Sequence, residues 1–286
     1  MQISVVGLGT WQFGGEWGHD FTQSEVDSIL DAAGTEGINF IDTAECYGDH
    51  LSEELVGAAI AADREKWYLG TKFGHRYKGL YDRDDLWRPE EVRTQLEDSL
   101  RALRTDYVDL YQFHSGTDAA LDNDELWSML RRQVEAGKVR HLGVSISSRA
   151  DGLRDAAYQT RRAREVGAET IQVVYNRLER DPEEEILPIC LDKDLGVLAR
   201  VPLASGFLTG KYRTGVRFGE NDVRSHKKNI DASLEEAERI RREEVPEGVD
   251  MAVWALQWCL RHPAVTAVIP GAKNPEQVRA NARAGR

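Results

Sequence analysis

Four side chains that could perform acid–base chemistry stand at the ends of short apolar runs in this sequence. Asp42 follows the run Ile38–Ile41, and Tyr47 comes five residues later, just before a glycine. Lys72 ends the run WYLGTK, and His114 ends the run YVDLYQFH. If these runs are parallel strands of a barrel, their carboxyl ends meet at one rim, and the four side chains converge there. Any one of them alone would be an ordinary cap or turn residue, but the four together indicate a catalytic site.

The chemistry of the four residue types is that of a proton donor. A phenol has an ordinary pKa near ~10 and gives up its proton reluctantly at neutral pH. A cation beside it stabilises the phenolate, so we expect Lys72 to lower the pKa of Tyr47, with Asp42 holding Lys72 charged and fixed. His114 would donate a hydrogen bond to a substrate oxygen and orient it towards Tyr47. The group is a general acid aimed at a carbonyl, and a hydride donor would make it a reductase.

The elements that must position these side chains alternate along all 286 residues. Apolar runs are separated by amphipathic segments, some with helix start signals: Thr22 opens a capping box, and Pro89 stands at a first helical position. Eight such repeats favour an α/β fold, a closed (β/α)8 or TIM barrel, in a single domain over residues 1–286. The strand-like runs are Ile3–Leu8, Ile38–Ile41, Trp67–Lys72, Tyr107–Phe113, His141–Val144, Thr170–Val174, Val197–Val201 and Val265–Ile269. The helix-like segments are Thr22–Glu36, Leu51–Ala62, Pro89–Leu103, Asp124–Ala136, Asp151–Val166, Pro182–Asp192, Val249–Arg261 and Pro275–Ala284. Residues 203–231 and 75–87 are two candidate lids.

Composition narrows the class of protein. The formal net charge of −12 repels phosphate backbones, so nucleic acid is not an expected partner. The chain has no apolar run long enough to span a bilayer, and its start lacks the features of a signal peptide. The three cysteines lie far apart in the sequence, so disulfides are not expected. The expected location is the cytoplasm. The seven histidines are dispersed without an HExxH pair, so no metal is expected.

The motifs together resemble one known family, the aldo-keto reductases. FIDTAECYG, YLGTKFG and DLYQFH are similar to its Asp, Tyr, Lys and His motifs in order and spacing. GLGTW, GKVRHLGVS, PLASGFLTGKY and IPGAKNPEQV resemble further family signatures, so the resemblance spans almost the whole chain. It implies a TIM barrel, NADPH as the usual hydride donor with NADH possible, and reduction of aldehydes or ketones. It also implies that Asp42, Tyr47, Lys72 and His114 are the catalytic tetrad. Both ends of the chain look short for the family.

The resemblance also implies a cofactor site across the barrel mouth. Gly7 and Gly9 do not open a Rossmann fingerprint, because Gln12 stands where the third glycine should be. Ser145 and Gln172 match residues that hold the nicotinamide carboxamide, although Ile146 replaces the Asn that usually follows the Ser. The other expected contacts are Arg200, Leu203, Gly206, Leu208, Gly210 and Lys211 around the nicotinamide and pyrophosphate, and Gly271, Lys273, Gln277 and Asn281 around the adenosine.

Two of these positions depart from the family pattern. Arg200 replaces the aromatic residue that usually stacks on the nicotinamide; its guanidinium plane can stack too, or it can pair with a carboxylate at the rim. Gln277 stands where many NADPH-binding relatives have Arg, which leaves selection of the 2′-phosphate to Lys273. Lys273 can equally be a solvated surface residue.

The short ends favour an open substrate pocket. Four aromatic residues are expected to line it, or alternatively to serve as lid packing: Trp11, Trp17, Tyr81 and Trp87. The expected partner is a small carbonyl compound, and the oligomeric state is not predicted. Two other functions stay open. Lys72 is placed where a Schiff-base aldolase carries its nucleophile. A redox-sensing subunit, similar to potassium-channel β subunits, would bind NADPH and turn over slowly.

Overall fold

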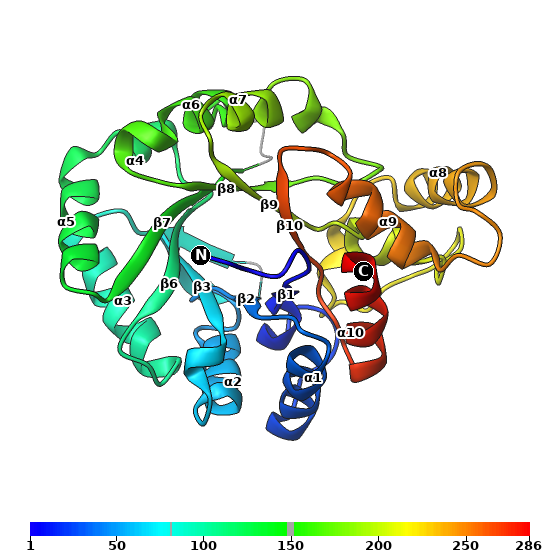
Figure 1. Cartoon of the computed structure of the whole chain (residues 1–286), viewed down its shortest axis with the longest axis horizontal. Coiled ribbons are helices and arrows are strands. Elements are labelled where there is room, and N and C mark those ends of the chain that lie inside the picture. The colour runs from blue at the N-terminus through cyan, green and yellow to red at the C-terminus, as the bar shows by residue number, and fades with distance from the viewer. Residues whose placement is uncertain (81, 148–151) are drawn as a thin grey trace.

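The chain forms the expected barrel of parallel strands surrounded by helices (Figure 1). The computed structural model describes residues 1–80, 82–147 and 152–286. Eight strands follow one another in the order β1-β2-β3-β6-β7-β8-β9-β10, and every neighbouring pair is parallel. Parallel bridges Val6–Val268 and Gly9–Gly271 join the last strand to the first and close the barrel. The strands are β1 (Leu8–Gly9), β2 (Phe40–Asp42), β3 (Tyr68–Phe73), β6 (Val108–His114), β7 (Val139–Ser145), β8 (Thr170–Val174), β9 (Gly196–Arg200) and β10 (Val265–Ile269).

The first strand is shorter than the sequence indicates. We expected a strand over Ile3–Leu8, but regular pairing covers Leu8–Gly9 alone. Upstream, the backbone is held by single contacts instead: the Ser4 amide donates to the Asn39 side chain, and the Gly7 amide donates to the Val268 carbonyl. Apolar composition predicted the run but not where a neighbouring strand begins to pair with it.

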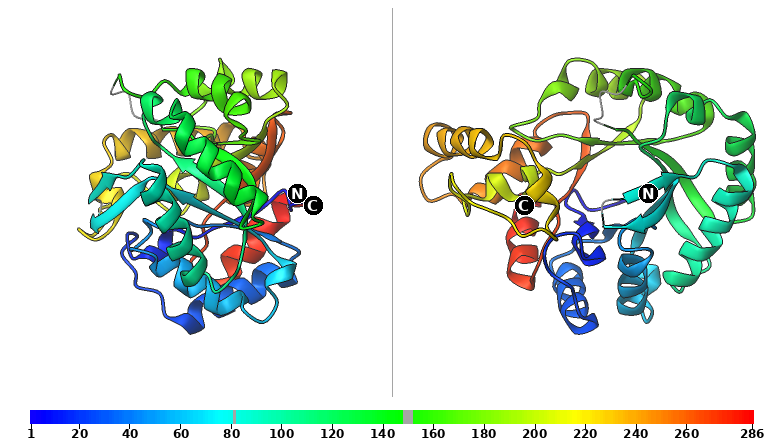
Figure 2. Two further views of the ribbon diagram at one scale, coloured as in Figure 1. Left: turned by 90° about the vertical axis from the view of Figure 1, so that its left-hand side faces the viewer. Right: turned by 180° about the vertical axis from the view of Figure 1, so that it is seen from behind.

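Helices cover the outside of the barrel, and their expected start signals are present. Thr22 and Glu25 form a reciprocal capping box, and Pro89 is the first residue of its helix. The segment predicted as Asp151–Val166 begins its helix at Ala156, with Asp155 as the N-cap; Asp151 lies outside the described residues. The helices are α1 (Gln23–Thr35), α2 (Leu51–Ile60), α3 (Pro89–Ala102), α4 (Asp118–Leu121), α5 (Asp124–Glu135), α6 (Ala156–Val166), α7 (Ile186–Asp192), α8 (Ile230–Glu243), α9 (Met251–Leu260) and α10 (Pro275–Ala282). The sequence did not predict α8, which projects from the side of the barrel (Figures 1 and 2).

The barrel interior is filled in layers, as side chains on alternate strand positions point inwards. Phe40, Leu110, Leu198 and Ala267 form an apolar layer, and a Cβ placed on Gly70 would lie 3.2 Å from the Phe40 ring. The inward positions two residues further along the strands carry polar groups instead. This polar layer consists of Asp42, Lys72, Gln112, Ser145, Gln172 and Arg200. Because inward and outward side chains alternate along each strand, the polar side chains lie inside the barrel at its carboxyl end.

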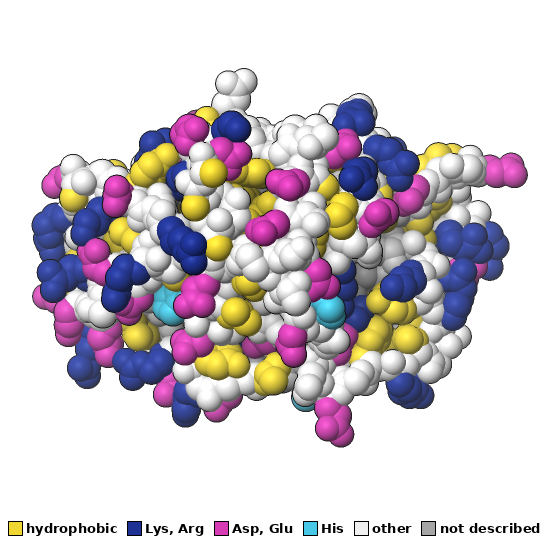
Figure 3. Space-filling view, turned by 90° about the horizontal axis from the view of Figure 1, so that it is seen from below, with side chains coloured by type: hydrophobic (Ala, Val, Ile, Leu, Met, Phe, Trp, Pro, Cys, Tyr) yellow, Lys and Arg dark blue, Asp and Glu magenta, His cyan; other side chains and the backbone are white. Residues whose placement is uncertain are grey.

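Both candidate lids have structure of their own. In one of them, β4 (His75–Gly79) and β5 (Asp82–Asp85) pair as an antiparallel hairpin. The other segment contains two 3-10 turns, Ala204–Thr209 and Val223–His226. Figure 2 shows both at one end of the barrel, with the two chain termini at the opposite end. On the face seen in Figure 3, acidic and basic side chains are interspersed among small hydrophobic patches. No helix of the described part of the chain is long and apolar enough to cross a membrane.

Candidate active site

Lys72 is the centre of the hydrogen-bond network at the catalytic end of the cavity, the end formed by Asp42, Tyr47, Lys72 and His114. The side chain of Lys72 is fully buried, and its amine donates to Asp42 Oδ1 at 2.7 Å, to the Thr43 carbonyl at 2.6 Å and to the Tyr47 hydroxyl at 3.1 Å. A charged amine has three donors, so all of them are used. Burial alone would lower the pKa of Lys72, but Asp42 and Tyr47 outweigh it and hold that pKa above its ordinary value. Lys72 therefore stays charged.

The other carboxylate oxygen of Asp42 is held by two amides that the sequence analysis did not connect with it. Gln112 donates to Asp42 Oδ2 at 3.1 Å, and Gln172 donates to the same atom at 2.7 Å. Gln112 was not predicted as a site residue. Its signal is its register: it precedes His114 by two residues on β6, so both point to the same side of the strand.

Tyr47 is positioned by a close approach of two backbone segments. A Cβ on Gly14 would lie 2.5 Å from the Tyr47 carbonyl carbon, and one on Gly48, whose φ is +72°, would lie 2.7 Å from the Gly14 oxygen. Glycine is required on both sides, because no larger residue fits the contact. The approach stacks the Tyr47 ring on Trp11 at a centroid distance of 6.0 Å, with the His114 ring edge-on at 6.3 Å.

Lys72 acts on the pKa of Tyr47 in the expected lowering direction, but the net shift of that pKa is upwards. Burial raises the pKa of Tyr47 to about 12, and the attraction of Lys72, although it acts in the lowering direction, does not offset burial. The physical reason is that burial removes the solvation of the phenolate. The attraction of Lys72, whose charge is already neutralised by Asp42, stabilises the phenolate by less than this loss. Tyr47 is thus neutral at neutral pH and carries a proton to give.

His114 is also neutral. Burial, and then the charges of His75 and Lys72, hold its pKa well below the ordinary value. Its Nδ1 lies 3.7 Å from Cys46 Sγ. In the tautomer in which Nδ1 accepts from that thiol, Nε2 carries the ring proton and can donate it to a ligand. Beside His114, the buried Glu45 has one oxygen without a hydrogen-bond partner, and burial raises the pKa of Glu45 to about 8. Glu45, Cys46 and His114 offer ligand atoms within 4.8 Å of one another, a grouping that dispersed histidines did not suggest.

The hairpin lid is fixed to this end of the cavity by Arg83. Its guanidinium donates to the buried Glu16 at 2.5 Å and to the Cys46 carbonyl at 3.1 Å, and the Trp11 indole donates to Glu16 as well. Arg83 and Glu16 were not predicted as site residues, because nothing in the sequence indicates that the hairpin contacts the segment after β1. The pairing places Trp11 over the reacting groups.

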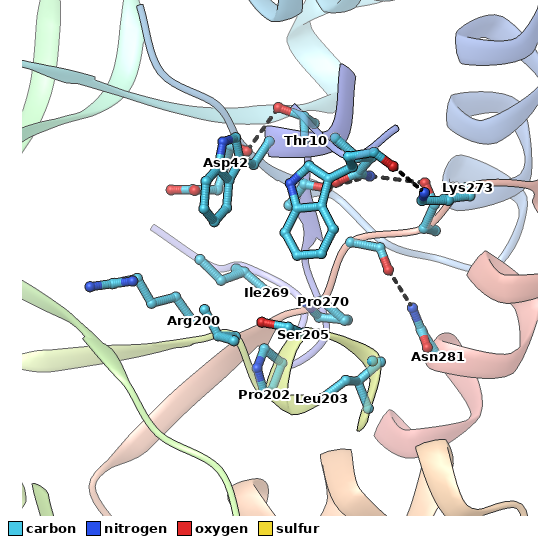
Figure 4. A pocket seen from close by; sticks show the side chains of 18 of the residues that line it. Thr10, Asp42, Arg200, Pro202, Leu203, Ser205, Ile269, Pro270, Lys273 and Asn281 are labelled. Atoms are coloured by element: carbon cyan, nitrogen blue, oxygen red, sulfur yellow. Dashed lines mark hydrogen bonds between the residues drawn. The ribbon is translucent and has the colours of Figure 1, made fainter. Parts of the chain in front are cut away.

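A cavity of about 570 Å³ runs across the barrel mouth from Tyr47 to α10 (Figure 4). Most predicted site residues meet on its wall, and Lys72 lies directly behind Tyr47. The predicted residues on the wall are Trp11, Trp17, Asp42, Tyr47, His114, Gln172, Arg200, Leu203, Gly206, Lys211, Gly271, Lys273, Gln277 and Asn281.

Besides Lys72, four described residues of the predicted set do not line the cavity. Ser145 is fully buried and bonds to Gln172, and Leu208 packs into the apolar cluster between the 204–209 turn and α9. Gly210 turns the chain with φ +72° beside Met251. Trp87 packs under the hairpin against the Phe113 ring at 4.6 Å, so for this residue the alternative of lid packing is the one the structure shows. Tyr81 lies outside the described residues.

The far end of the cavity, formed by Lys211, Arg224, Lys273, Gln277 and Asn281, is rich in cations. Burial and then the nearby Arg224 lower the pKa of Lys273, although Asp222, the ion-pair partner of Arg224, acts in the opposite direction. The Lys273 amine donates to the Trp17 carbonyl at 2.8 Å, and its backbone amide donates to Gln277 Oε1 at 2.8 Å. Lys273 is therefore half-buried in the cavity wall rather than a solvated surface residue.

These features fit a dinucleotide. Crowded cations beside the N-terminus of α10 favour phosphate groups. Gly206, with φ +93°, brings the backbone to the cavity wall, where a Cβ would lie 3.3 Å from the Tyr212 ring. Near the catalytic end, Arg200 Nε is buried without a hydrogen-bond partner, and its Nη2 donates to the Ile146 carbonyl at 3.3 Å. No described carboxylate forms an ion pair with Arg200, so pairing at the rim is not its role.

The geometry is unsuited to a Schiff-base aldolase. A nucleophilic lysine needs a lowered pKa and a free amine facing substrate. Lys72 has a raised pKa, no exposed surface, and three occupied donors.

Comparison with known proteins agrees with the site. The pattern of the aldo/keto reductase family matches residues 5–286. Aldo-keto reductase YhdN of Bacillus subtilis (strain 168) is 32% identical over 296 aligned residues, which cover 98% of this chain and 84% of the relative. The structure of glycerol dehydrogenase AKR11B4 from Gluconobacter oxydans is similar with a TM-score of 0.82 and 33% identity, covering 99% of this chain and 87% of the other. An aldo-keto reductase from Klebsiella pneumoniae in complex with NADPH is similar with a TM-score of 0.71 and 30% identity, covering 99% and 86%.

The chain therefore belongs to the aldo/keto reductase family. It is an NAD(P)H-dependent oxidoreductase with a TIM-barrel fold.

Proposed function

We propose that this protein reduces an aldehyde or ketone to an alcohol with NADPH, and that Tyr47 supplies the proton. Bound at the cavity, the cofactor supplies a hydride to the carbonyl carbon. His114, neutral and with Nε2 free to donate, orients the carbonyl oxygen. Tyr47 gives its proton to that oxygen, and Lys72 stabilises the phenolate left behind.

The observation that carries this proposal is the direction of one hydrogen bond. Lys72 is the donor to the Tyr47 oxygen at 3.1 Å, because a charged amine has no lone pair to accept. The hydroxyl proton of Tyr47 is consequently not used by Lys72, and Tyr47 lines the cavity. The proton is therefore available to a ligand there.

The residues proposed to hold the cofactor fall into two groups along the cavity. Ser145, Gln172 and Arg200 would surround the nicotinamide, with Ser145 acting through its contact with Gln172. The remaining proposed contacts are Leu203, Gly206 and Lys211 for the pyrophosphate, and Gly271, Lys273, Gln277 and Asn281 for the adenosine and its 2′-phosphate. Leu208 and Gly210, which do not line the cavity, would act only by shaping the turn between Gly206 and Lys211. The Klebsiella relative was solved with NADPH, which supports NADPH over NADH as the cofactor of this chain.

The test is Tyr47→Phe, with NADPH binding followed by fluorescence and turnover followed on a panel of small aldehydes and ketones. Loss of the hydroxyl should lower kcat by about 10²–10⁴-fold, the range of general acid catalysis, and leave NADPH affinity nearly unchanged. Tyr158→Phe, on the outer helix α6, is the matched control and should keep wild-type kcat. Full activity of Tyr47→Phe would mean that another group is the acid. NADPH binding by the wild type without turnover of any carbonyl would favour a redox-sensing subunit instead.

A further inference from the structure

Arg200 is a cation of the catalytic end without an acidic partner. Among the described Lys and Arg side chains there, Lys72 is paired with Asp42, and Arg83 is paired with Glu16. Arg200 makes one hydrogen bond, to the Ile146 carbonyl, and its Nε is buried without a partner. No described carboxylate forms an ion pair with it, and Glu179 and Asp42 attract its charge only from a distance.

The register of β9 explains why this charge faces the reaction. Arg200 is two residues beyond Leu198, which belongs to the apolar layer inside the barrel, so Arg200 points inwards as well. Figure 4 shows it extending from β9 on the side of Asp42, away from Lys273 and Asn281. Burial lowers the pKa of Arg200, while attraction by the Tyr47 phenolate, Glu179 and Asp42 opposes that effect, so the charge of Arg200 reaches the catalytic end. A guanidinium nevertheless stays protonated at neutral pH.

Hydride transfer creates a second positive charge at the same end. In the proposed function, the dihydronicotinamide is neutral, and the ring that has lost its hydride is a cation. The donor carbon must come within about 3–3.5 Å of the carbonyl carbon whose oxygen Tyr47 protonates. The ring therefore becomes charged on the stretch of cavity wall that Arg200 shares with Tyr47 and Gln172.

We propose that Arg200 makes the cofactor site selective for the reduced cofactor: it repels the oxidised, cationic nicotinamide and leaves the affinity for the neutral reduced form untouched. The inference rests on the proposed function and adds a property that this function does not require. The same repulsion lowers the driving force of hydride transfer from the bound reduced cofactor while it weakens binding of the oxidised product. The enzyme would thus release NADP⁺ readily and be inhibited weakly by it.

The measured quantity is the ratio of the dissociation constants for NADP⁺ and NADPH, determined by equilibrium fluorescence titration of the full chain. Two like charges a few ångströms apart in a partly buried site interact strongly enough to change this ratio by about ten- to a hundredfold. Arg200→Gln, which keeps a donor for the Ile146 carbonyl, should lower the ratio at least ~10-fold, mainly through tighter NADP⁺ binding. Arg200→Lys keeps the charge and should keep most of the ratio.

Lys211→Gln is the matched control, since Lys211 lines the cavity near the turn at Gly210 and is proposed to meet phosphates. The phosphate charges are the same in both oxidation states, so this change should weaken NADP⁺ and NADPH by equal factors. An unchanged ratio in Arg200→Gln would overturn the proposal. If Arg200→Gln instead raised KM for carboxylate-bearing carbonyl compounds above that for neutral analogues, with the ratio unchanged, Arg200 would serve the substrate. If the wild type bound neither nucleotide, the proposed function would be wrong as well.

Discussion

The two ends of the cavity are built differently. At the catalytic end, Asp42, Lys72 and His114 each lie on a barrel strand and belong to the inward-facing set. At the far end, Lys211 follows the 204–209 turn, Arg224 lies in the 223–226 turn, Lys273 precedes α10, and Gln277 and Asn281 lie on α10. A hydrogen-bonded barrel fixes the first group, whereas the second depends on irregular segments bridged to one another, as at Trp17–Asp222.

This difference matches the tasks that the two ends are proposed to perform. Proton donation requires fixed geometry and a pKa set by burial. The barrel strands fix Asp42 and Lys72, and Lys72 in turn holds the hydroxyl of Tyr47, which lies in the turn after β2. Holding a charged ligand that enters and leaves requires cations on segments that can open, and loops are the less stable parts of a fold. We therefore expect changes at the catalytic end to affect kcat and stability, and changes at the far end to affect cofactor affinity alone.

The largest expected effect comes from breaking the buried pair at the catalytic end. Lys72→Met would leave Asp42, 3% exposed, without its cation, and removing one partner of a buried pair costs about 3–5 kcal/mol of unfolding free energy. It would also lower kcat by at least ~10²-fold, because the phenolate of Tyr47 would lose its stabilising charge. Denaturant unfolding and steady-state kinetics measure the two effects.

The double variant Asp42→Asn with Lys72→Met is the control for this prediction. It should recover part of the lost stability, since no unpaired charge remains, but none of the lost kcat. If Lys72→Met were as stable as the wild type, the buried pair of Asp42 and Lys72 would not contribute to stability. The expected link between the catalytic end and stability would then be wrong.

The next effect is a pH dependence confined to the catalytic end. Glu45 has an ordinary pKa of 4.5, which burial and then Glu53 raise to about 8 in the folded chain. Between these values the folded state keeps a proton that the unfolded chain has released, so Glu45 makes stability fall as pH rises from about 4.5 to 8. Glu45→Gln removes this slope and should gain on the order of 2–4 kcal/mol over the wild type between pH 5 and pH 8.

Thermal and denaturant unfolding at several pH values would measure the gain. Glu54→Gln, at an exposed position of the neighbouring helix α2, should leave the wild-type pH dependence as it is. If Glu45→Gln and wild type showed parallel stability profiles from pH 5 to 8, Glu45 would be ionised throughout that range.

The same contrast decides how much could be predicted from the sequence. The barrel and the convergence of Asp42, Tyr47, Lys72 and His114 follow from strand order and from the rule that parallel strands end at one rim. The sign of the Tyr47 pKa shift could not be predicted, because it depends on the extent of burial by Trp11 and its neighbours. Gln112 was accessible in principle from its register on β6, but nothing in the sequence paired it with Asp42.

The contacts of loop residues could not be predicted from strand order and strand ends. The contact between Lys273 and the Trp17 carbonyl joins positions 256 residues apart, and it depends on how two irregular segments settle over the cavity. The pairing of Arg83 with Glu16 has the same character. Leu208 was expected at the site because it lies in a family motif, and Trp87 because it is one of four aromatic residues that could line the pocket. Both instead supply packing. The cytoplasmic location stays a prediction.

The smallest expected effect is on cofactor affinity at the far end of the cavity. It tests whether residues there act without affecting kcat. Lys273→Met removes one of the crowded cations there and should raise KM for NADPH about tenfold, as expected for loss of one phosphate contact, with kcat unchanged. KM for NADH should rise less, because NADH lacks the 2′-phosphate. Lys228→Met, at an exposed position outside the cavity, should change neither value. Should Lys273→Met lower kcat as strongly as it raises KM, the far end would also take part in positioning the reacting groups, and the separation of tasks between strands and loops would fail.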